Sequence, residues 1–213
     1  IVLSFSLGLI LLGALWIYLA ESLFAGGHAA HGVLDALFHS VTARTAGFNT
    51  VDISQYGTST HLLMMLLMLI GASPGSAGGG MKTVTVALIV LYVWCVWKRR
   101  QDTELGFRKL PDETVRNAFL IGALYLFMVG VATLALSVTE GAPLEVILFE
   151  EISAMGTVGL SLGLTPVLSD PGKVIIMLSM LVGRIGPLTL LLALGRRASA
   201  GRYQYPREDV VLG

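Results

Sequence analysis

The sequence has 213 residues, of which 54% are hydrophobic and 13% charged, and its mean hydropathy of +0.78 excludes an ordinary soluble domain. A net charge of zero, from 14 basic and 14 acidic residues, excludes a basic nucleic-acid-binding module. A single cysteine, Cys95, excludes a disulfide framework. We therefore expect an integral membrane protein of apolar helices, and the 25 glycines indicate that loops interrupt some of them.

The first predicted element is Ile1–Ala20, a charge-free run long enough to cross a hydrocarbon core of ~30 Å. No basic leader or small-residue cleavage site precedes Glu21, so we interpret the run as a retained spanning helix and not as a signal peptide. Because the chain starts at an Ile, we also expect further sequence before it. The apolar blocks in chain order are Ile1–Ala20, Leu62–Trp97, Ala118–Val138 and Val174–Leu194.

Between the first two blocks, and again between the last two, lies a shorter apolar segment. Gly32–Thr45 and Ala142–Met155 have about 14 residues each, or ~21 Å of helix, which is too short to cross a bilayer. A glycine-containing strip ends or follows each segment, TAGFN at 45–49 and TVGLS at 157–161. We expect two re-entrant half-helices; the alternative is an amphipathic surface helix and a loop.

The second block is too long for one straight span. It contains Gly71–Gly80 (GASPGSAGGG), in which five glycines and one proline disfavour a helix by ~1 kcal/mol per Gly and ~3 kcal/mol per Pro. We therefore expect the helix to break there, near the middle of the membrane. The alternatives are a break that serves packing only and a phosphate-binding loop, whose required spacing Met81 disrupts.

A constant sequence separation relates the two halves of the chain, and we call it the repeat offset. The pairs that share it are Thr45 and Thr157, Gly47 and Gly159, Asn49 and Ser161, and Gly71 and Gly183. The sequence therefore predicts two parallel copies of one unit, each a span, a half-helix, a glycine strip and a second span.

The basic residues predict the orientation of the chain. Ten of the 14 lie in Lys98–Arg116 or beyond Leu194, and the positive-inside rule makes this face cytoplasmic. The half-helices then enter from outside. The acidic residues of the outer side are Glu21, Asp35, Asp52, Glu140, Glu145, Glu150, Glu151 and Asp170. We interpret them as an acidic vestibule that concentrates cations, with ordinary solvated loops as the alternative.

The predicted half-helices suit a dehydrated cation. Each points its carbonyl end, which carries roughly −0.5 charge, at the middle of the membrane, and the strip that follows exposes backbone oxygens. Glycine reaches backbone conformations that turn successive carbonyls towards an axis. Because no carboxylate lies in either strip, the pattern favours a monovalent alkali cation over calcium or magnesium.

Four strings resemble the potassium-transporter superfamily of TrkH, KtrB and the plant HKT proteins, and the likeness is closest to KtrB. They are SVTARTAGFNTVD (Ser40–Asp52), GASPGSAGGGMKT (Gly71–Thr83), EEISAMGTVGLSLGLTP (Glu150–Pro166) and GRIGPLT (Gly183–Thr189). The resemblance implies an all-α, potassium-channel-like fold of four outer helix–pore loop–inner helix repeats around one pathway. This chain would be the third repeat (1–100), a basic cytoplasmic linker (101–116), the fourth repeat (117–197) and a cytoplasmic tail (198–213).

The resemblance also assigns an ion filter and a gate. The filter would be the strips Thr45, Ala46, Gly47, Phe48, Asn49 and Thr157, Val158, Gly159, Leu160, Ser161. Potassium would bind the carbonyls of Thr45, Ala46, Gly47, Thr157, Val158 and Gly159. The gate would be the intramembrane loop Gly71, Ala72, Ser73, Pro74, Gly75, Ser76, Ala77, Gly78, Gly79 and Gly80.

Arg184 is the only charge between Val174 and Leu194, and such a residue usually faces the bundle interior or an aqueous cavity. We expect Arg184 to stand opposite the loop, donate to its carbonyls and add a barrier to cations; a purely structural buried pair is the alternative. His28 and His31 lie in an outer loop without a third metal ligand near them in sequence. No catalytic constellation is visible, so we expect no enzyme.

The function implied is sodium-dependent potassium uptake across a bacterial plasma membrane. Potassium is then the substrate, sodium an activator, and no cofactor is bound. The implied partners are the lipid bilayer, a second copy of the membrane subunit and a cytoplasmic nucleotide-binding ring of the KtrA type, with no nucleic acid. Two alternatives stay open: a sodium-selective or poorly selective permease of the same fold, and a non-conducting half-subunit, because two strips do not enclose a pore.

Overall fold

The computed structural model describes residues 2–24, 32–71, 73, 75, 78–99, 104–105, 108–186 and 189. The first half comprises α1 (Val2–Leu19), the π-helical turn η1 (Ala20–Phe24), α2 (Val33–Thr42), the 3-10 turn η2 (Ile53–Gln55), α3 (Thr58–Leu69) and α4 (Thr83–Trp97). The second half comprises β1 (Glu104–Leu105), β2 (Arg108–Lys109), α5 (Asp112–Thr139), α6 (Leu144–Met155), the 3-10 turn η3 (Thr165–Val167) and α7 (Asp170–Ile185). Apart from one hairpin of two-residue strands, the regular elements of the described residues are all helices or helical turns.

The order and spacing of the elements agree with the two-copy prediction. The turns η2 and η3 begin one repeat offset apart, at Ile53 and Thr165, and so do α3 and α7, which start at Thr58 and Asp170. The outer helices α1 and α5 precede the half-helices α2 and α6 in the same order. The two halves are therefore structural repeats of one unit, although their sequences differ along most of their length.

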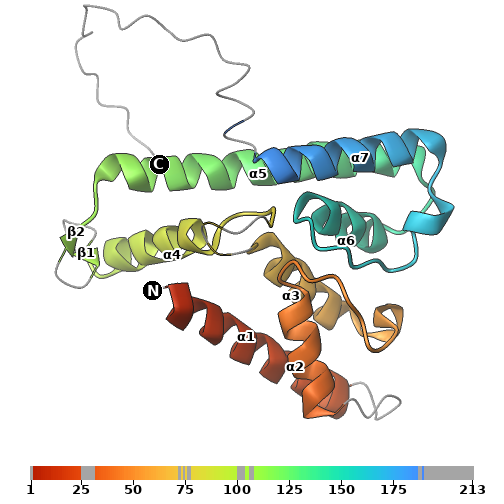
Figure 1. Cartoon of the computed structure of the whole chain (residues 1–213), viewed down its shortest axis with the longest axis horizontal. Coiled ribbons are helices and arrows are strands. Elements are labelled where there is room, and N and C mark those ends of the chain that lie inside the picture. The colour runs from red at the N-terminus through yellow and green to blue at the C-terminus, as the bar shows by residue number, and fades with distance from the viewer. Residues whose placement is uncertain are drawn as a thin grey trace, which may run out of the picture.

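The helix α6 lies at the junction of the two halves. It contacts α5 and α7 of its own half and α3 of the other half. Figure 1 shows α5 and α7 running alongside each other, with α6 beside them and α3 between α6 and α1. On the opposite side of the junction α4 packs on both α1 and α5. The half-helix α6 therefore positions its strip against elements of both copies.

The two outer helices are long and apolar enough, by length and composition, to cross a membrane. Only 17% of the apolar window of α1 and 28% of that of α5 is buried inside the structure. Large apolar side chains such as Trp16 and Phe127 are exposed along them. These faces suit contact with hydrocarbon. The core lies between the halves instead, where Met64, Met68 and Phe149 are fully buried and pack behind the two strips.

The predicted break of the second apolar block is confirmed. The helix α3 ends at Leu69 and α4 begins at Thr83. The ends of the loop between them are held together, because Ile70 pairs with Met81 in a single bridge and the Met81 N–H donates to the Leu69 carbonyl at 3.2 Å. The chain therefore leaves α3 and enters α4 at neighbouring points, with the loop projecting between them.

Two helices differ in their bounds from the predicted segments. The helix α5 begins at Asp112, inside the segment predicted as a linker, and Pro111 stands at its N-cap with two acidic residues in its first turn. The helix α7 ends at Ile185, where Gly186 adopts a left-handed φ of 90°, and most of the predicted block beyond it, up to Leu194, lies outside the described residues. The predicted tail, 198–213, lies outside the described residues.

Candidate ion filter and gate

The two candidate filter strips share an unusual backbone. Thr45 and Thr157 have φ angles of 70° and 53°, and Gly47 and Gly159 have φ angles of 80° and 94°. Left-handed backbone is strained for a β-branched residue, at on the order of 1–3 kcal/mol, and persists only where the surroundings impose it. Because the same alternation occurs in both copies, it is a property of the repeated unit. Because of these positive φ angles, the carbonyls of both strips do not point along a helix axis, as those of α2 and α6 do.

The two strips lie directly against each other. A Cβ atom built on Gly47 would stand 2.2 Å from the carbonyl oxygen of Val158 and 3.4 Å from the Cα of Gly159. A Cβ built on Gly159 would meet the Cα of Gly47 at 3.7 Å. The two backbones touch here because neither glycine has a side chain. Strips that lie one repeat offset apart in sequence are therefore neighbours in space.

Thr42, in the last turn of α2, holds the first strip. Its hydroxyl accepts a hydrogen bond from the Phe48 N–H at 2.8 Å and donates one to the Phe48 carbonyl at 2.6 Å. Its own carbonyl accepts from Ala46 and Gly47 at 3.1 and 3.3 Å. The sequence prediction missed Thr42, although a hydroxyl side chain in the last turn of a half-helix is the signal that could have indicated it.

Ser153 plays the corresponding part for the second strip. Its carbonyl accepts from the Val158 N–H at 2.9 Å, and its hydroxyl oxygen accepts from the Gly159 N–H at 3.2 Å. The side chain is 3% exposed. This residue was also missed. Each strip is thus fastened to the helix before it by a hydroxyl side chain, which fixes where the strip carbonyls lie.

Glu150, on α6, organises the turn that follows the second strip. Its carboxylate accepts from the Ser161 hydroxyl, the Leu162 N–H (3.1 Å), the Leu164 N–H (3.2 Å) and the Thr165 hydroxyl (2.7 Å). Because these bonds satisfy both carboxylate oxygens, the side chain can be buried. Glu150 is therefore a structural residue that shapes the exit of the strip.

The remaining predicted filter residues differ between the copies. In the first strip, the side chains of Phe48 and Asn49 are exposed, and Asn49 donates to the Val51 carbonyl at 3.4 Å. In the second strip, Leu160 is buried in the core. The two strips therefore resemble each other in backbone conformation more than in the burial of their side chains.

The Gly-rich loop lies next to the second strip. The Gly79 N–H donates to the Thr157 hydroxyl oxygen at 2.6 Å. A Cβ on Gly79 would stand 2.9 Å from the Gly183 carbonyl, and one on Gly71 would stand 2.2 Å from the Gly79 carbonyl. Gly75 and Gly80 are left-handed, with φ of 83° and 76°. The predicted gate residues Ala72, Pro74, Ser76 and Ala77 lie outside the described residues.

Arg184 lines a cavity beside the second strip. The cavity has a volume of about 440 Å³ and its walls include Thr157–Ser161. The arginine is exposed, and among the described residues it forms no hydrogen bond with the loop. On α7 it is Gly183 that packs against the loop, at Gly79, and against the Met155 carbonyl. Arg184 is the next residue and so points ~100° further around the helix, away from the loop. Its predicted hydrogen bonds to the loop are absent from this part of the chain.

The predicted acidic vestibule was wrong for three of its members. Glu21, Glu150 and Glu151 are 4%, 5% and 0% exposed and do not face solvent. Asp52 is exposed, and hydrogen bonds from the Ser54 side chain and backbone hold its pKa below the ordinary value. Fewer of the predicted acidic residues are therefore exposed than the sequence indicates. His28 and His31 lie outside the described residues.

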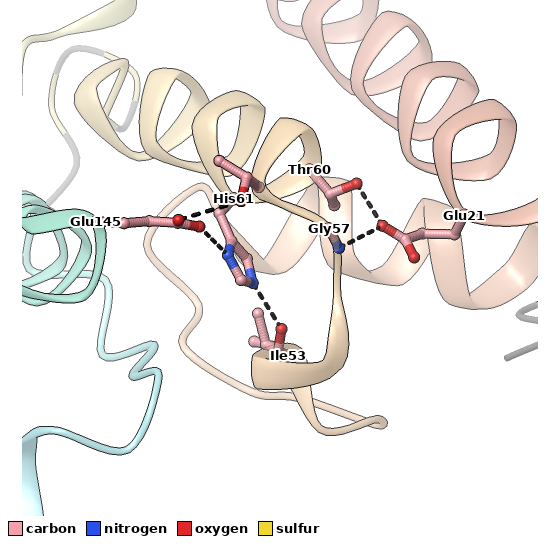
Figure 2. Close-up of polar contacts among 7 residues, drawn as sticks. Glu21, Ile53, Gly57, Thr60, His61 and Glu145 are labelled. Carbon is pink, nitrogen blue, oxygen red and sulfur yellow. Dashed lines mark hydrogen bonds and ion pairs between the residues drawn. The ribbon is translucent and has the colours of Figure 1, made fainter. Parts of the chain in front are cut away.

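Carboxylates that are buried (Glu21) or half-buried (Glu140) cap the inner helix of each copy at equivalent places. Glu21 accepts from the Gly57 N–H at 3.2 Å and from the Thr60 hydroxyl at 2.5 Å, at the start of α3 (Figure 2). Glu140 accepts from the Ser169 N–H at 3.2 Å, at the start of α7. Gly57 and Ser169 are one repeat offset apart and are the N-caps of these helices. A negative charge at this end also complements the helix dipole.

His61 joins the two copies through a contact between α3 and α6 (Figure 2). Its Nδ1 lies 2.6 Å from a carboxylate oxygen of Glu145 on α6, and its Nε2 lies 2.9 Å from the Ile53 carbonyl. Thr58 donates to the other Glu145 oxygen at 3.1 Å. A carbonyl only accepts, so Nε2 is the donor to Ile53. This pair fixes α6 to the start of α3.

The chain matches known proteins along most of its length. The family described as "TrkH: Cation transport protein" matches residues 2–200. The chain is 40% identical to the Ktr system potassium uptake protein D of Bacillus subtilis over 207 residues, which is 96% of this chain and 46% of that protein. It is 40% identical to the potassium/sodium uptake protein NtpJ of Enterococcus hirae over 191 residues, 84% of this chain and 41% of that protein.

The fold also matches a solved structure, that of the potassium transporter TrkH from Vibrio parahaemolyticus. The TM-score is 0.78 at 24% identity, over 90% of this chain and 43% of that one. The chain thus spans less than half the length of these relatives. Its apolar outer helices and the match to a cation transport family make it a membrane protein of that transport family. With nearly all of its sequence, residues 2–200, within the family match, the chain belongs to the TrkH family of cation transport proteins.

Proposed function

We propose that this chain forms half of a channel-like pathway for potassium uptake across a bacterial plasma membrane. The observation that carries the proposal is the contact between two equivalent left-handed strips, at Gly47 and Val158. The relatives reported above support it, because one is named as a potassium uptake protein and the other as a potassium/sodium uptake protein. In the full-length protein, two further strips complete a ring of carbonyls around the ion.

The ion would be held by backbone oxygens. Carbonyls of Thr45, Ala46 and Gly47 in one strip, and of Thr157, Val158 and Gly159 in the other, replace the hydration shell of potassium. Thr42 and Ser153 support this role, because their hydrogen bonds fasten the strips and limit how far the carbonyls can follow a smaller ion. The strips contain no carboxylate, which supports a monovalent over a divalent cation.

The Gly-rich loop is the gate in this proposal. Gly79 contacts Thr157 of the second strip and Gly183 of α7, so the loop stands where it would obstruct an ion that leaves the strip. Irregular backbone at membrane depth is tolerated where it is buried in protein or lines a cavity. Arg184 adds a local electrostatic barrier from the cavity wall.

The orientation and the partners belong to the same proposal. The basic segment 98–116 and the tail face the cytoplasm, where a nucleotide-binding regulatory ring of the KtrA type acts on the gate. The relative named as part of a Ktr system supports a membrane subunit that works with other components. The membrane subunit is a homodimer in the lipid bilayer, and sodium activates transport.

The test is uptake of rubidium-86 by bacteria that lack other potassium transporters and express the full-length protein. The proposal predicts saturable uptake that excess potassium abolishes and that excess sodium does not. Strong competition by sodium would favour the sodium-selective or poorly selective permease, which the name of the Enterococcus relative supports. Absence of uptake by a folded full-length protein would contradict transport and favour a non-conducting subunit.

A further inference from the structure

Thr157 takes part in two structures at once. Its carbonyl belongs to the second strip, and its side-chain oxygen accepts a hydrogen bond from the Gly79 N–H of the loop at 2.6 Å. The residue is half-buried, and its φ of 53° is unusual for a β-branched residue. The hydroxyl is thus the point at which candidate filter and candidate gate are joined by a hydrogen bond.

The loop packs tightly where Gly79 lies against Thr157 and Gly183, and we call this contact the seat of the loop. A Cβ on Gly79 would lie 2.6 Å from the Thr157 Cγ2 and 2.9 Å from the Gly183 carbonyl oxygen, both too near for any side chain. Gly71 packs equally closely against the Gly79 carbonyl from the other side. The seat therefore admits glycine only. The N–H of Gly79 has no side chain to shield it and depends on Thr157 for its hydrogen bond.

The other strip lacks this contact. Thr45 is related to Thr157 by the repeat offset and also has a left-handed backbone, with φ of 70°. Within the described ranges, the Thr45 hydroxyl forms no hydrogen bond. The two threonines therefore share residue type, strip position and backbone conformation and differ in their contact with the loop.

We propose that the Thr157 hydroxyl is a latch that holds the Gly-rich loop against the second strip and so sets how often the gate opens. The inference rests on the proposed function of the strip and the loop. Opening moves Gly79 away from Thr157 and breaks this part-buried hydrogen bond. One hydrogen bond of this kind shifts an equilibrium roughly 2- to 10-fold. Thr157 is thus a positioning residue for the gate as well as a member of the strip.

The experiment uses the full-length protein carrying Ser73→Cys in the loop, with its native cysteines, Cys95 included, removed. Three variants are compared in this background: Thr157→Val, Thr157→Ser and Thr45→Val. Valine keeps the shape and the backbone strain of threonine but cannot accept the hydrogen bond, whereas serine can. The readouts are the rate at which a cationic thiol reagent modifies the introduced cysteine, rubidium-86 uptake, and thermal unfolding as a check of folding.

The latch predicts that Thr157→Val raises the modification rate roughly 2- to 10-fold and raises rubidium uptake, that Thr157→Ser restores the parent rate, and that Thr45→Val does not raise the modification rate. Equal modification rates in the two valine variants would overturn it, and so would a serine variant that behaves like valine.

Gly79→Ala tests the contact of the loop with Thr157 and Gly183 independently. It should also raise the modification rate, because the new methyl group displaces the loop, and an unchanged rate would refute the contact. If the parent protein takes up no rubidium, the proposed function is wrong, while the modification rates still decide the latch.

Discussion

The two filter glycines offer a matched pair of substitutions with different expected outcomes. Gly47 and Gly159 occupy equivalent strip positions and both have positive φ, so alanine at either costs ~1–2 kcal/mol of backbone strain. They differ in the space around the new methyl group. At Gly159 its nearest neighbour would be 3.7 Å away, which is ordinary contact. At Gly47 it would stand 2.2 Å from the Val158 carbonyl oxygen, far inside the 3.4 Å at which ordinary contact begins.

Val158 has little room to give way. Its N–H is bonded to the Ser153 carbonyl at 2.9 Å, and its side chain is 4% exposed in the core behind the strips. Gly47→Ala must therefore move a filter carbonyl by about 1 Å, a displacement that is large in a close-packed interior. We expect Gly47→Ala to lower rubidium-86 uptake at least 10-fold at equal protein level. Strain of ~1–2 kcal/mol is small beside a typical folding stability of ~5–15 kcal/mol, so Gly159→Ala should keep most of its uptake.

The assay compares both variants with the parent protein in cells that lack other potassium transporters, with the amount of membrane protein measured in parallel. Growth at low external potassium gives an independent readout. If Gly159→Ala lost as much uptake as Gly47→Ala, strain and not contact between the strips would be responsible. Normal uptake by Gly47→Ala would refute the contact altogether.

Three further outcomes follow from other sites. Arg184→Ala should raise rubidium uptake if the guanidinium is a barrier to cations; unchanged flux through a correctly folded protein would count against that role. His61→Leu should lower the free energy of unfolding by about 1–3 kcal/mol, because the Ile53 carbonyl and one half-buried Glu145 oxygen lose their partner, and Glu145→Gln should lower it less, as thermal unfolding in detergent can measure. Glu151→Met should raise the thermal midpoint, since Glu151 is fully buried and neither carboxylate oxygen has a hydrogen-bond partner among the described residues; a fall would mean that the carboxyl group is needed.

Those elements of the fold could be predicted whose position depends on the residue types and the segment length at that place in the sequence. Glycine and proline density located the break at 71–80, and segment length separated the long outer helices α1 and α5 from the half-helices α2 and α6. The offset between Gly47 and Gly159 located both strips, because their left-handed backbone needs glycine. The interruption of α7 at Gly186 was not predicted, because the apolar run continues past it and hydropathy does not register a single left-handed residue.

The supporting contacts could not be predicted, because they join residues that are distant or shifted in sequence. Glu21 and Glu140 cap equivalent helices but are separated by more than the repeat offset, so the offset does not pair them. Acidic residues were expected to face water, yet Glu150 is buried because donors from the following turn satisfy it. Sequence patterns report polarity, whereas burial depends on partners that only the fold supplies.

The central claim is that the paired strips bind a dehydrated potassium ion through their backbone carbonyls. Anomalous scattering from rubidium in crystals of the full-length protein tests it directly. The account predicts rubidium peaks on the axis of the ring, within coordinating distance of carbonyls from 45–47 and 157–159. Rubidium bound elsewhere in the membrane domain, with none along the strips, would contradict it.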